Sequence, residues 1–581
     1  MCGIAGQIDL KKKLNHNNSI NETLSHRGPH SKKVLRLKDN LIFYHTRLKI
    51  IDLSNESNQP MSSENLRYTI IYNGELYNYL DIREELEKKG ITFKTNGDTE
   101  VFLKGFIEFG IKFFKKINGI FAVSIYDKKL NNIYFARDFI GVKPLYYTHD
   151  NNNFIFSSEL KTIVKALKAK CRLNNKFLNE YLYYKYITGN NTLVKDIYKF
   201  EPGKIYKINL NKKSIKLEHA KYYSFKEKKL YHNIDEATQN FQNLFERSVK
   251  LQLQSDANLG VQLSGGVDST LITEFAVKQK KIKHLFFSYF KNFEKDEFDY
   301  AKYVSKKLNI KFKKIEHSKK IFDNSFLKSI YYLDEPLNHP HSVAIFQISK
   351  IAKKNVSVLL TGEGADELFF GYERYKNILQ KKISVLDLVK NGAFLRSKKD
   401  LELFEKFRSN KFGNPHSNRI KLFNKINVNN RIKKFQVFET QSHLQSLLLR
   451  SDKMMMANSI EARVPFLDFE IYNYALNLPD NFKNSKIQKP ILKKILSDKG
   501  YPYNFVNRTK IGYIVPFNKW ILQKKNFKKD LITDNLLNFF GKKELESLSF
   551  QLERNKNIYS NAKMYWLMKN LDQFINIFEL N

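Results

Sequence analysis

The chain has 581 residues, enough for more than one domain, and its 42% hydrophobic content can form large cores. It has only two cysteines, no run of about 18 apolar residues and no basic segment followed by an apolar run at its start, so we expect no disulfide framework, no membrane span and no secretory signal. These features predict a cytoplasmic protein. The net charge of +41 comes from dispersed lysines without a long basic block, so we expect no specific nucleic-acid partner and no membrane partner.

Residues 2 to about 200 contain short alternating runs of apolar and polar residues, which are typical of β-strands. The runs are LIFYHTRLKIID, RYTIIYNGELYN, INGIFAVSIYDKK, NNIYFARD and NFIFSSEL. A helical pattern, YLDIREELEKKG at residues 79–90, lies between two of them and ends at a glycine. The mixture predicts an α+β layered domain with antiparallel sheets.

One of the two cysteines, Cys2, stands directly behind the initiator methionine. If Met1 is removed, which a small second residue favours, Cys2 gains a free α-amine with an ordinary pKa near ~8, and this amine can accept the thiol proton. Gly3 lets other backbone approach closely. The pattern therefore favours an amino-terminal nucleophile, and the alternative is a small residue without a catalytic role.

Four motifs follow Cys2 in order: HRGP at residues 26–29, HTRL at 45–48, YNGELYN at 72–78 and NGDTE at 96–100. Together with the leading Cys-Gly, they resemble the pattern of the class II glutamine amidotransferases, the N-terminal-nucleophile (Ntn) glutaminases. Two positions depart from it, because His30 replaces the usual aspartate and Phe139 stands where a basic residue is common.

The resemblance implies a role for each matching residue in glutamine binding and cleavage. Cys2 is the nucleophile, Arg47 pairs with the α-carboxylate of glutamine, and Asp98 takes its α-ammonium. Taken alone, Arg47 could also be a solvated surface arginine.

The NGE motif completes the implied glutamine site. Asn73 and the backbone N–H of Gly74 form the oxyanion hole, and Glu75 lies beside the substrate. Taken alone, the three residues could also form an ordinary hairpin turn.

Residues 205–233 are polar and lysine-rich, and they read as a strand pair followed by a linker. From about residue 234 the pattern changes to an amphipathic helix, then apolar strand, glycine loop and helix. This unit begins at NLGVQLSGGVDSTLITEFAVKQ and recurs at HLFFSYF and at NVSVLLTGEGADELFFGY. Repeated units imply a parallel sheet covered by helices, and residues from about 380 to 581 add a mainly helical extension.

The segment LSGGVDST at residues 263–270 follows an apolar strand and precedes a helix. Its two glycines let the backbone wrap a phosphate group, and the start of the helix presents unpaired N–H donors. It lacks the Gly-Lys-Ser/Thr ending of a Walker loop and matches instead the pyrophosphate loop of enzymes that adenylate a substrate. Asp268 beside phosphates requires a cation between them, for which Mg²⁺ is expected.

A second acidic loop, LLTGEGADELFFGY at residues 359–372, also leaves an apolar strand. Loops at the carboxyl ends of parallel strands converge on one crevice, so Asp366 is expected to be the second carboxylate on Mg²⁺. Glu363 and Glu367 are further candidates, and Glu367 could also be a helix N-terminal charge.

The two halves together resemble the glutamine-hydrolysing asparagine synthetase family over nearly the whole chain. Later motifs agree: LLLRSDKMMMANSIEARVPFLD at residues 447–468, KPILKK at 489–494 and RTKIGYIVPFNKW at 508–520. The resemblance implies an αββα Ntn-hydrolase sandwich at residues 2–205, a linker at 206–233 and an α/β synthetase domain with a parallel sheet and a helical extension at 234–581. The implied ATP-binding residues are Leu263, Ser264, Gly265, Gly266, Asp268, Ser269, Ser288, Gly362, Glu363 and Lys489, and the implied metal ligands are Asp268 and Asp366.

The resemblance also implies the chemistry. Cys2 attacks the glutamine amide and releases ammonia, while ATP activates an acceptor carboxylate as its AMP ester and releases pyrophosphate. Ammonia reaches this ester through an internal passage and displaces AMP. The implied small molecules are glutamine, ATP, Mg²⁺ and aspartate, and a homodimer is one arrangement that the resemblance allows.

The acceptor is left open by DEPLNHPHS at residues 334–342, because Asn338 and His339 stand where aspartate-using relatives often have a further Asp. The first alternative is a related amidotransferase that acts on another carboxylate, such as a uronic acid of a surface polysaccharide. A second is an RNA- or membrane-binding protein built on an inactive synthetase, and a third is another class II amidotransferase. Two interpretations stay open for the charged residues of the motif at 447–468: they could form a structural ion-pair network, or they could shape the cleft. These residues are Asp452, Glu461, Arg463 and Asp468.

Overall fold

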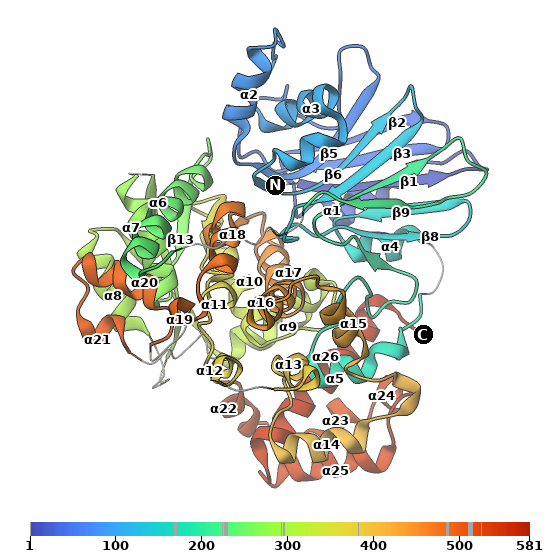
Figure 1. Cartoon of the computed structure of the whole chain (residues 1–581). Helices are drawn as coiled ribbons and strands as arrows, with labels where there is room; N and C mark the ends of the chain where they lie inside the picture. Colours follow the sequence, from blue (N-terminus) through green and yellow to red (C-terminus); the bar gives the residue numbers. More distant parts are fainter. Residues whose placement is uncertain are drawn as a thin grey trace.

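The computed structural model shows two antiparallel sheets followed by a parallel sheet and many helices (Figure 1). It describes residues 2–167, 171–223, 225, 231–279, 281–291, 293, 297–380, 383–483, 487–508, 515–524 and 526–581. Met1, whose removal the sequence suggested, lies outside these residues, as do residues 509–514 of the RTKIGYIVPFNKW motif.

The amino-terminal half is a sandwich of two six-stranded antiparallel sheets. The first sheet has the order β10 (Tyr198–Lys199), β8 (Tyr146–His149), β9 (Asn153–Ser157), β1 (Cys2–Asp9), β3 (Leu41–Arg47) and β2 (Ser31–Lys38). The second has the order β12 (Glu218–Lys221), β11 (Lys204–Asn209), β7 (Asn132–Arg137), β6 (Gly119–Asp127), β5 (Tyr68–Leu76) and β4 (Met61–Ser62).

Successive side chains of a β-strand point to opposite faces of its sheet, and this alternation explains the layers of the sandwich. Ile71 of β5 and Phe43 of β3 point into the core between the sheets, whereas Ile70 of β5 packs on the other face with Phe102. Helices α2 (Tyr79–Glu87) and α3 (Asp98–Phe109) cover that outer face, and α1 (Asn18–Leu24) and α4 (Leu160–Leu167) cover the outer face of the first sheet. The amino-terminal half therefore has the αββα layering that the sequence predicted.

The strand pair expected within residues 205–233 is present as β11 and β12. Strand β11 pairs with β7 of the second sheet, and β12 pairs with β11. The second sheet thus continues through Lys221, and the division of the chain at residues 205 and 234 stays a prediction.

The parallel sheet lies in the carboxyl-terminal half. Its order is β15 (Phe312–His317), β14 (Ile282–Phe290), β13 (Leu259–Gln262), β16 (Val358–Leu360) and β17 (Glu461–Arg463), and every neighbouring pair is parallel. The chain runs outward from β13 to β15 on one side and from β16 to β17 on the other. The strand order therefore reverses between β13 and β16, where ligands bind in open sheets of this type.

Helices surround this sheet and form the expected extension (Figure 1). Those that accompany the sheet are α6 (Ile234–Gln252), α7 (Val267–Lys278), α8 (Phe298–Lys307), α9 (Lys319–Leu333), α10 (His341–Ala352) and α11 (Ala365–Leu368). Helix α5 (Leu178–Tyr184) belongs to the amino-terminal half of the chain. The helices of the extension are α12 (Lys376–Gln380), α13 (Val385–Lys390), α14 (Lys398–Phe407), α15 (Ser417–Lys425), α16 (Arg431–Gln441), α17 (His443–Met456), α18 (Phe469–Asn477), α19 (Asp480–Lys483), α20 (Pro490–Asp498), α21 (Tyr503–Val506), α22 (Phe517–Leu522), α23 (Lys528–Leu531), α24 (Asp534–Leu537), α25 (Lys542–Glu553) and α26 (Ile558–Phe578).

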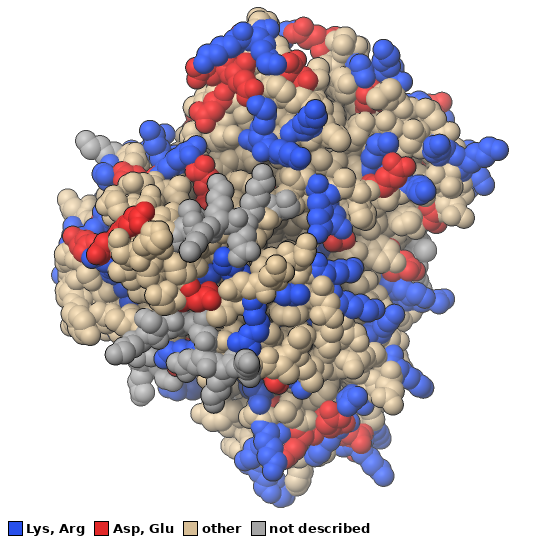
Figure 2. All heavy atoms as spheres, viewed as in Figure 1, with Lys and Arg blue, Asp and Glu red and all other residues tan. Residues whose placement is uncertain are grey.

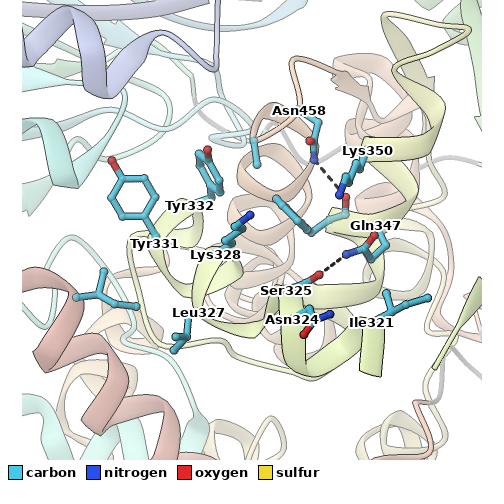
Figure 3. A pocket seen from close by; sticks show the side chains of 13 residues that line it. Ile321, Asn324, Ser325, Leu327, Lys328, Tyr331, Tyr332, Gln347, Lys350 and Asn458 are labelled. Atoms are coloured by element: carbon cyan, nitrogen blue, oxygen red, sulfur yellow. Dashed lines mark hydrogen bonds between the residues drawn. The ribbon is translucent and has the colours of Figure 1, made fainter. Parts of the chain in front are cut away.

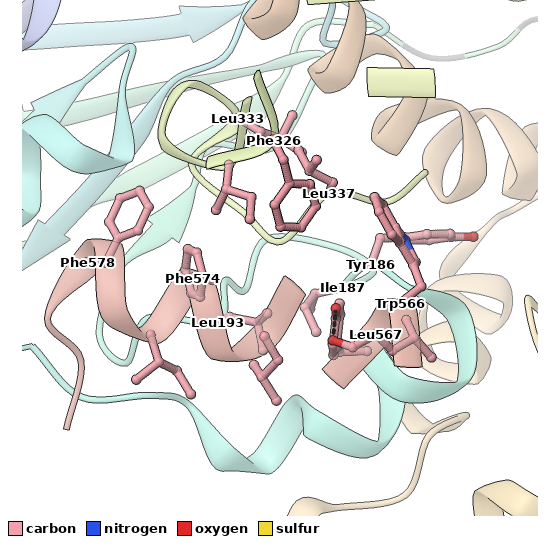
Figure 4. Packing of buried hydrophobic residues seen from close by; sticks show 14 of the residues in the cluster. Tyr186, Ile187, Leu193, Phe326, Leu333, Leu337, Trp566, Leu567, Phe574 and Phe578 are labelled. Atoms are coloured by element: carbon pink, nitrogen blue, oxygen red, sulfur yellow. Dashed lines mark hydrogen bonds between the residues drawn. The ribbon is translucent and has the colours of Figure 1, made fainter. Parts of the chain in front are cut away.

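One hydrophobic cluster joins the two halves. It contains residues of α1, α4 and α5 together with residues of α9, α10, α17 and α26. Figure 4 shows part of it, where Phe326 of α9 lies 5.7 Å from Trp566 of α26 between ring centroids and Tyr186 packs nearby. Burial of such aromatic side chains contributes strongly to stability, so we expect the halves to pack as one body.

Two surface properties bear on the expected partners. No helix among the described residues is both long enough and apolar enough to cross a membrane. Lysine and arginine side chains are spread over the face in Figure 2 with acidic side chains among them, so on this face the positive charge is not gathered into a single stripe.

Candidate functional site

Cys2 begins β1, next to Arg47 of the neighbouring strand β3 in the sheet register. The cysteine is buried, and burial raises the pKa of its thiol. The nitrogen of Cys2 donates a hydrogen bond of 3.0 Å to Oδ1 of Asn73. Asn73 therefore holds the nitrogen that becomes the α-amine once Met1 is removed.

The NGE motif lies inside strand β5, where Asn73 and Gly74 pair with residues of β6. The hairpin-turn alternative is therefore wrong. A Cβ on Gly74 would lie 2.2 Å from the carbonyl oxygen of Ile120, so the close packing of the strands requires glycine here. The Nδ2 group of Asn73 is buried and has no hydrogen-bond acceptor among the described residues. It is a donor that an oxyanion could use.

Arg47 is 4% exposed, which contradicts the solvated-surface alternative. Its guanidinium donates to the carbonyl of Ser54 at 2.5 Å, to Oδ1 of Asn58 at 3.1 Å and to the carbonyl of Asp52. These bonds fix the planar group at the end of β3, on the same side as Cys2. The burial lowers the pKa of Arg47, with nearby acids opposing the shift.

Asp98 opens α3 and is buried. Its Oδ2 accepts hydrogen bonds from the N–H of Leu76 at 2.9 Å and from the hydroxyl of Tyr72 at 3.1 Å. Burial raises the pKa of Asp98, while these two donors oppose the shift. A cation that binds Asp98 would favour its charged form.

Glu75 turns toward the carboxyl-terminal half. Its Oε2 lies 3.2 Å from Nη2 of Arg463, whose Nε lies 2.5 Å from Oε1 of Glu461 on β17. Burial raises the pKa of Glu75 well above its usual range, Glu461 adds to the shift and Arg463 opposes it. Glu75 on β5 thus directly contacts Arg463 on the edge strand of the parallel sheet.

The LSGG loop follows β13, as predicted, and α7 begins directly after it with Gly266 as its N-cap. Gly265 has φ +79°, and a Cβ there would lie 2.8 Å from the backbone nitrogen of Ala301. Inside the loop, Oγ of Ser264 lies 2.9 Å from Oγ of Ser269 and accepts from the N–H of Gly266 at 3.2 Å. The first N–H groups of α7 face outward from this turn and can bind phosphate oxygens.

Lys489 brings the two predicted carboxylates together. Its Nζ lies 2.7 Å from both oxygens of Asp268 and 2.5 Å from Oδ1 of Asp366. The lysine itself has φ +52° and stands directly before α20. The ammonium group of Lys489 bridges Asp268 and Asp366, which shows that both carboxylates reach a common point. Two carboxylates together with phosphate oxygens form a set of ligands that suits Mg²⁺. Among the described residues, no group of three His, Cys, Asp or Glu offers an all-protein metal site.

A cavity of about 190 Å³ opens at the carboxyl ends of β13 and β16. The predicted residues that line it are Ser264, Gly266, Asp268, Ser269, Gly362, Glu363, Asp366 and Lys489. Three other predicted residues have different surroundings. Leu263 donates its N–H to the carbonyl of Phe286 at 3.0 Å, Gly265 forms the tight turn, and Ser288 on β14 lies 2.9 Å from Nε2 of His317.

Sequence reasoning did not assign several residues that line this cavity. Arg508 forms a 2.5 Å ion pair with Glu297 and donates to the carbonyl of Gly265 at 3.1 Å, so it braces the phosphate loop. Gly371 lies against the Asp366–Lys489 pair, because a Cβ there would lie 2.0 Å from Oδ1 of Asp366 and from Cε of Lys489. For Gly371, the only signal in the sequence was its place as the last glycine of the motif LLTGEGADELFFGY.

Helix α17 connects the two ends of the molecule. Arg450 lies 3.3 Å from Oε1 of Glu363 in the cavity at β13 and β16, and Asp452 lies 2.9 Å from Nη2 of Arg27. The Nε of Arg27 donates a hydrogen bond of 3.1 Å to the carbonyl of Cys2. A single helix therefore contacts the acidic loop directly and, through Arg27, the strand that carries the cysteine.

Further buried charges surround this connection. Lys453 of α17 lies 2.9 Å from Glu159 and 2.6 Å from Asp334, and Lys161 lies 3.0 Å from Asp334. Burial opposes ionisation of Glu159, but Lys161, Lys453 and Arg27 hold the pKa of Glu159 well below its usual range. For Asp452, Glu461 and Arg463, the structure shows the ion-pair network that the sequence left as one of two interpretations.

A wider cavity of about 680 Å³ lies between α9 and α10 (Figure 3). Ser325 and Lys328 of α9 and Gln347 and Lys350 of α10 line it, and Gln347 donates a hydrogen bond to Ser325. The described residues that line this cavity include none of those predicted to bind glutamine or ATP. The residues predicted to bind ATP and Mg²⁺ line the smaller cavity instead.

Comparisons with known proteins match both halves of the chain. Residues 1–223 match the family model "Glutamine amidotransferase domain", and residues 240–574 match "Asparagine synthase". Asparagine synthetase [glutamine-hydrolyzing] 1 of Bacillus subtilis is 31% identical over 568 residues, with 90% of this chain and 89% of the relative covered. Asparagine synthetase [glutamine-hydrolyzing] 3 of the same organism is 30% identical, with 85% of this chain and 84% of the relative covered.

Two further matches cover a smaller share of the chain. A putative asparagine synthetase [glutamine-hydrolyzing] 2 of Methanocaldococcus jannaschii is 32% identical, with 69% of this chain and 82% of the relative covered. A solved structure of glutamine phosphoribosylpyrophosphate amidotransferase from B. subtilis aligns with a TM-score of 0.29 at 15% identity, over 56% of this chain and 70% of that chain.

Proposed function

Since this chain belongs to the asparagine synthase family and carries an amino-terminal glutamine amidotransferase domain, we propose that it transfers the amide nitrogen of glutamine to a carboxylate activated with ATP. The observation that carries the proposal is that Asp268 and Asp366 both contact Lys489 beside a phosphate-type loop, in a chain whose second residue is a buried cysteine. We propose that residues 2–205 hold the glutaminase activity and residues 234–581 the synthetase activity.

The first half-reaction takes place at Cys2. After Met1 is removed, the α-amine accepts the thiol proton, and the thiolate attacks the amide carbon of glutamine. The buried Nδ2 of Asn73 and the N–H of Gly74 stabilise the oxyanion, ammonia leaves, and water releases glutamate from the thioester. Arg47 binds the α-carboxylate and Asp98 the α-ammonium, and both groups are already fixed by hydrogen bonds.

The second half-reaction takes place in the cavity at β13 and β16. The acceptor carboxylate attacks the α-phosphorus of ATP, pyrophosphate leaves, and ammonia then displaces AMP from the acyl-adenylate. The LSGG loop and the start of α7 bind the phosphates, and Lys489 neutralises part of their charge. Asp268 and Asp366 would hold Mg²⁺, which supplies charge neutralisation of the leaving pyrophosphate when it is bound.

The acceptor that we propose is aspartate, so that the products are asparagine, glutamate, AMP and pyrophosphate, as expected of a glutamine-hydrolysing asparagine synthase. Support comes from curated relatives whose names state that activity and that share about 30% identity over most of the chain.

Amide-labelled glutamine tests this proposal. The protein is incubated with labelled glutamine, ATP, Mg²⁺ and L-aspartate, and we expect the label in asparagine together with AMP and pyrophosphate. Formation of ADP and phosphate would contradict the adenylation step. Labelled nitrogen in the amide of a uronic acid, with none in asparagine, would assign the activity to the polysaccharide-type alternative.

The proposal predicts a steric requirement at Gly371. Alanine there would push apart Asp366 and Lys489, both 2.0 Å from the added Cβ, so ATP-dependent AMP formation should fall roughly a hundredfold. Glutamine hydrolysis, measured as glutamate release, should persist. Gly90→Ala is the comparison variant. No atom lies within 4 Å of the Cβ that it adds, but Gly90 has φ +82°, so this variant reports the effect of backbone strain without a steric clash. Normal AMP formation by Gly371→Ala would show that the lysine bridge is not needed.

A further inference from the structure

A carboxylate of the carboxyl-terminal half contacts the loop that holds Arg47. Asp256 lies between α6 and β13, and its Oδ2 accepts a hydrogen bond of 2.8 Å from the backbone N–H of Asp52. The backbone N–H of Asp256 donates in turn to the carbonyl of Ile50 at 2.9 Å. Two hydrogen bonds therefore join the loop after β3 to the segment that leads into β13.

Asp52 connects the supports of the two residues that are predicted to bind the amino-acid end of glutamine. Its carbonyl accepts a hydrogen bond from the guanidinium of Arg47, the residue predicted to bind the α-carboxylate. Its Oδ2 accepts a hydrogen bond of 3.0 Å from the N–H of Asn96, two residues before Asp98, which is predicted to bind the α-ammonium. A single residue thus contacts both sides of the predicted glutamine site.

The backbone conformation of Asp52 needs support. Its φ is +55°, a left-handed value that costs free energy for a residue with a side chain. The side chain supplies part of the support, because Oδ1 accepts from the N–H of Ser54 at 2.9 Å and Oδ2 accepts from the hydroxyl of Ser57 at 2.7 Å. Burial opposes ionisation of Asp52, but its hydrogen bonds with Ser54, Ser57 and Asn96 lower its pKa to about 2. The carboxylate therefore stays charged near neutral pH.

The loop around Asp52 has little apolar packing of its own. Residues 48–60 lie outside any helix or strand, and residues 53–56 are exposed. The side chain of Leu53 keeps 48% of its surface exposed. Because few apolar contacts hold such a loop, its order depends on hydrogen bonds, and the bond to Asp256 is among them.

The segment that carries Asp256 is itself firmly held. Nη1 of Arg463 on β17 donates hydrogen bonds of 2.7 Å to the carbonyls of Gln252 and Gln254. The parallel sheet therefore holds Asp256 in place beside Asp52. A support that is already ordered lowers the cost of ordering the loop when a ligand binds.

We propose that Asp52 and Asp256 are positioning residues for glutamine, so that the affinity of the amino-terminal site depends on a carboxylate of the other half. The inference rests on the proposed function and deepens it. Asp256 holds the N–H of Asp52, and Asp52 presents its carbonyl to Arg47 and its carboxylate to Asn96. The groups that bind the amino-acid end of glutamine are then in place before glutamine arrives. Both aspartates act through Arg47 and Asp98.

Asp256→Ala removes the acceptor from the other half and tests the inference. We expect the KM of glutamine, measured from glutamate release by the full chain, to rise roughly fivefold to tenfold while kcat changes by less than about twofold. Synthesis from ammonium chloride should keep its normal rate, which reports that the chain is folded. Asp256→Asn keeps one acceptor oxygen for the N–H of Asp52 and should restore most of the affinity.

Asp235→Ala is the matched control. Asp235 is an exposed aspartate at the opposite end of α6, and it pairs with Lys494 of the same half at 3.2 Å. Its replacement removes the same charge from the same part of the chain without touching the loop of Asp52. The KM of glutamine and the rate of synthesis from ammonium chloride should both stay unchanged.

Asp52→Asn tests the other end of the contact. Asparagine tolerates the positive φ, but its amide nitrogen cannot accept a hydrogen bond, so it cannot serve the N–H groups of both Ser54 and Asn96. We expect the KM of glutamine to rise again. In the double variant with Asp256→Ala, the KM should rise by less than the product of the two single effects, because both act on the same loop. Effects that multiply fully would overturn the connection through Asp52.

A normal KM of glutamine in Asp256→Ala would overturn the inference and leave the proposed function intact. Equal losses of glutamine hydrolysis and of synthesis from ammonium chloride would also overturn it, since they would indicate general damage to the junction. Absence of glutamine hydrolysis in the unchanged protein would overturn the proposed function itself, and the inference with it.

Discussion

Replacement of Cys2 by alanine is expected to abolish glutamine-dependent synthesis, with a loss of at least about a thousandfold, while synthesis from added ammonia continues. The reason is that the thiol has no substitute near the oxyanion donors. Asn73 and Gly74 lie on β5 next to the start of β1, and the other cysteine of the chain, Cys171, lies in a separate hydrophobic cluster. The measurement is asparagine formation with glutamine and, separately, with ammonium chloride at saturating ATP.

Cys171→Ala is the matched control for this experiment. Cys171 is also a buried, free cysteine, but it belongs to the hydrophobic cluster beside α26 and lies outside the predicted glutamine site. It should retain both activities. Equal loss of both activities in Cys2→Ala would show that the cysteine supports the fold as a whole, and retention of both would remove it from the mechanism.

Asp366→Asn should produce the opposite pattern, with AMP formation lowered about a hundredfold to a thousandfold and glutamine hydrolysis retained. Asparagine keeps the shape of the side chain but removes its negative charge. Asp268 and Asp366 both contact Lys489, and without the charge at position 366 the two side chains can no longer hold a divalent cation well. Initial rates of AMP and glutamate formation, measured over a range of Mg²⁺ concentrations, separate the two effects.

Asp299→Asn is the control for this substitution, because Asp299 is an exposed carboxylate of α8 in the same half of the chain. It should behave like the unchanged protein at every Mg²⁺ concentration. If Asp366→Asn forms AMP at the normal rate with the normal Mg²⁺ dependence, the proposed metal ligand is wrong.

Local patterns predicted the parts of the molecule that depend on neighbouring residues in the chain. The alternating runs gave the strands of the sandwich, and the order strand, glycine loop, helix gave the parallel sheet and its two loops. The meeting of Asp268 and Asp366 was predictable because the carboxyl ends of adjacent parallel strands share one edge.

Features that depend on side chains brought together by the fold could not be predicted in this way. The sequence suggested that Lys489 contacts ATP phosphates, but its bridge to Asp268 joins residues 221 positions apart. The resemblance implied that Glu75 lies beside glutamine, which stays a prediction, but it gave no sign of the contact between Glu75 and Arg463 of the other half. Glycine is needed at position 371 because the side chains of Asp366 and Lys489 both lie against it.

The charged contacts of α17 restrict how this protein could be taken apart or recombined. Asp452 pairs with Arg27 and Lys453 with Glu159 across the junction, and removing one partner of a buried ion pair costs about 3–5 kcal/mol. Each half produced separately should also expose its share of the hydrophobic cluster that joins the halves and should therefore aggregate, which size-exclusion chromatography of the two fragments would reveal. Chimaeras that graft a foreign glutaminase onto this synthetase should need matched replacements at these four positions before the hybrid assembles.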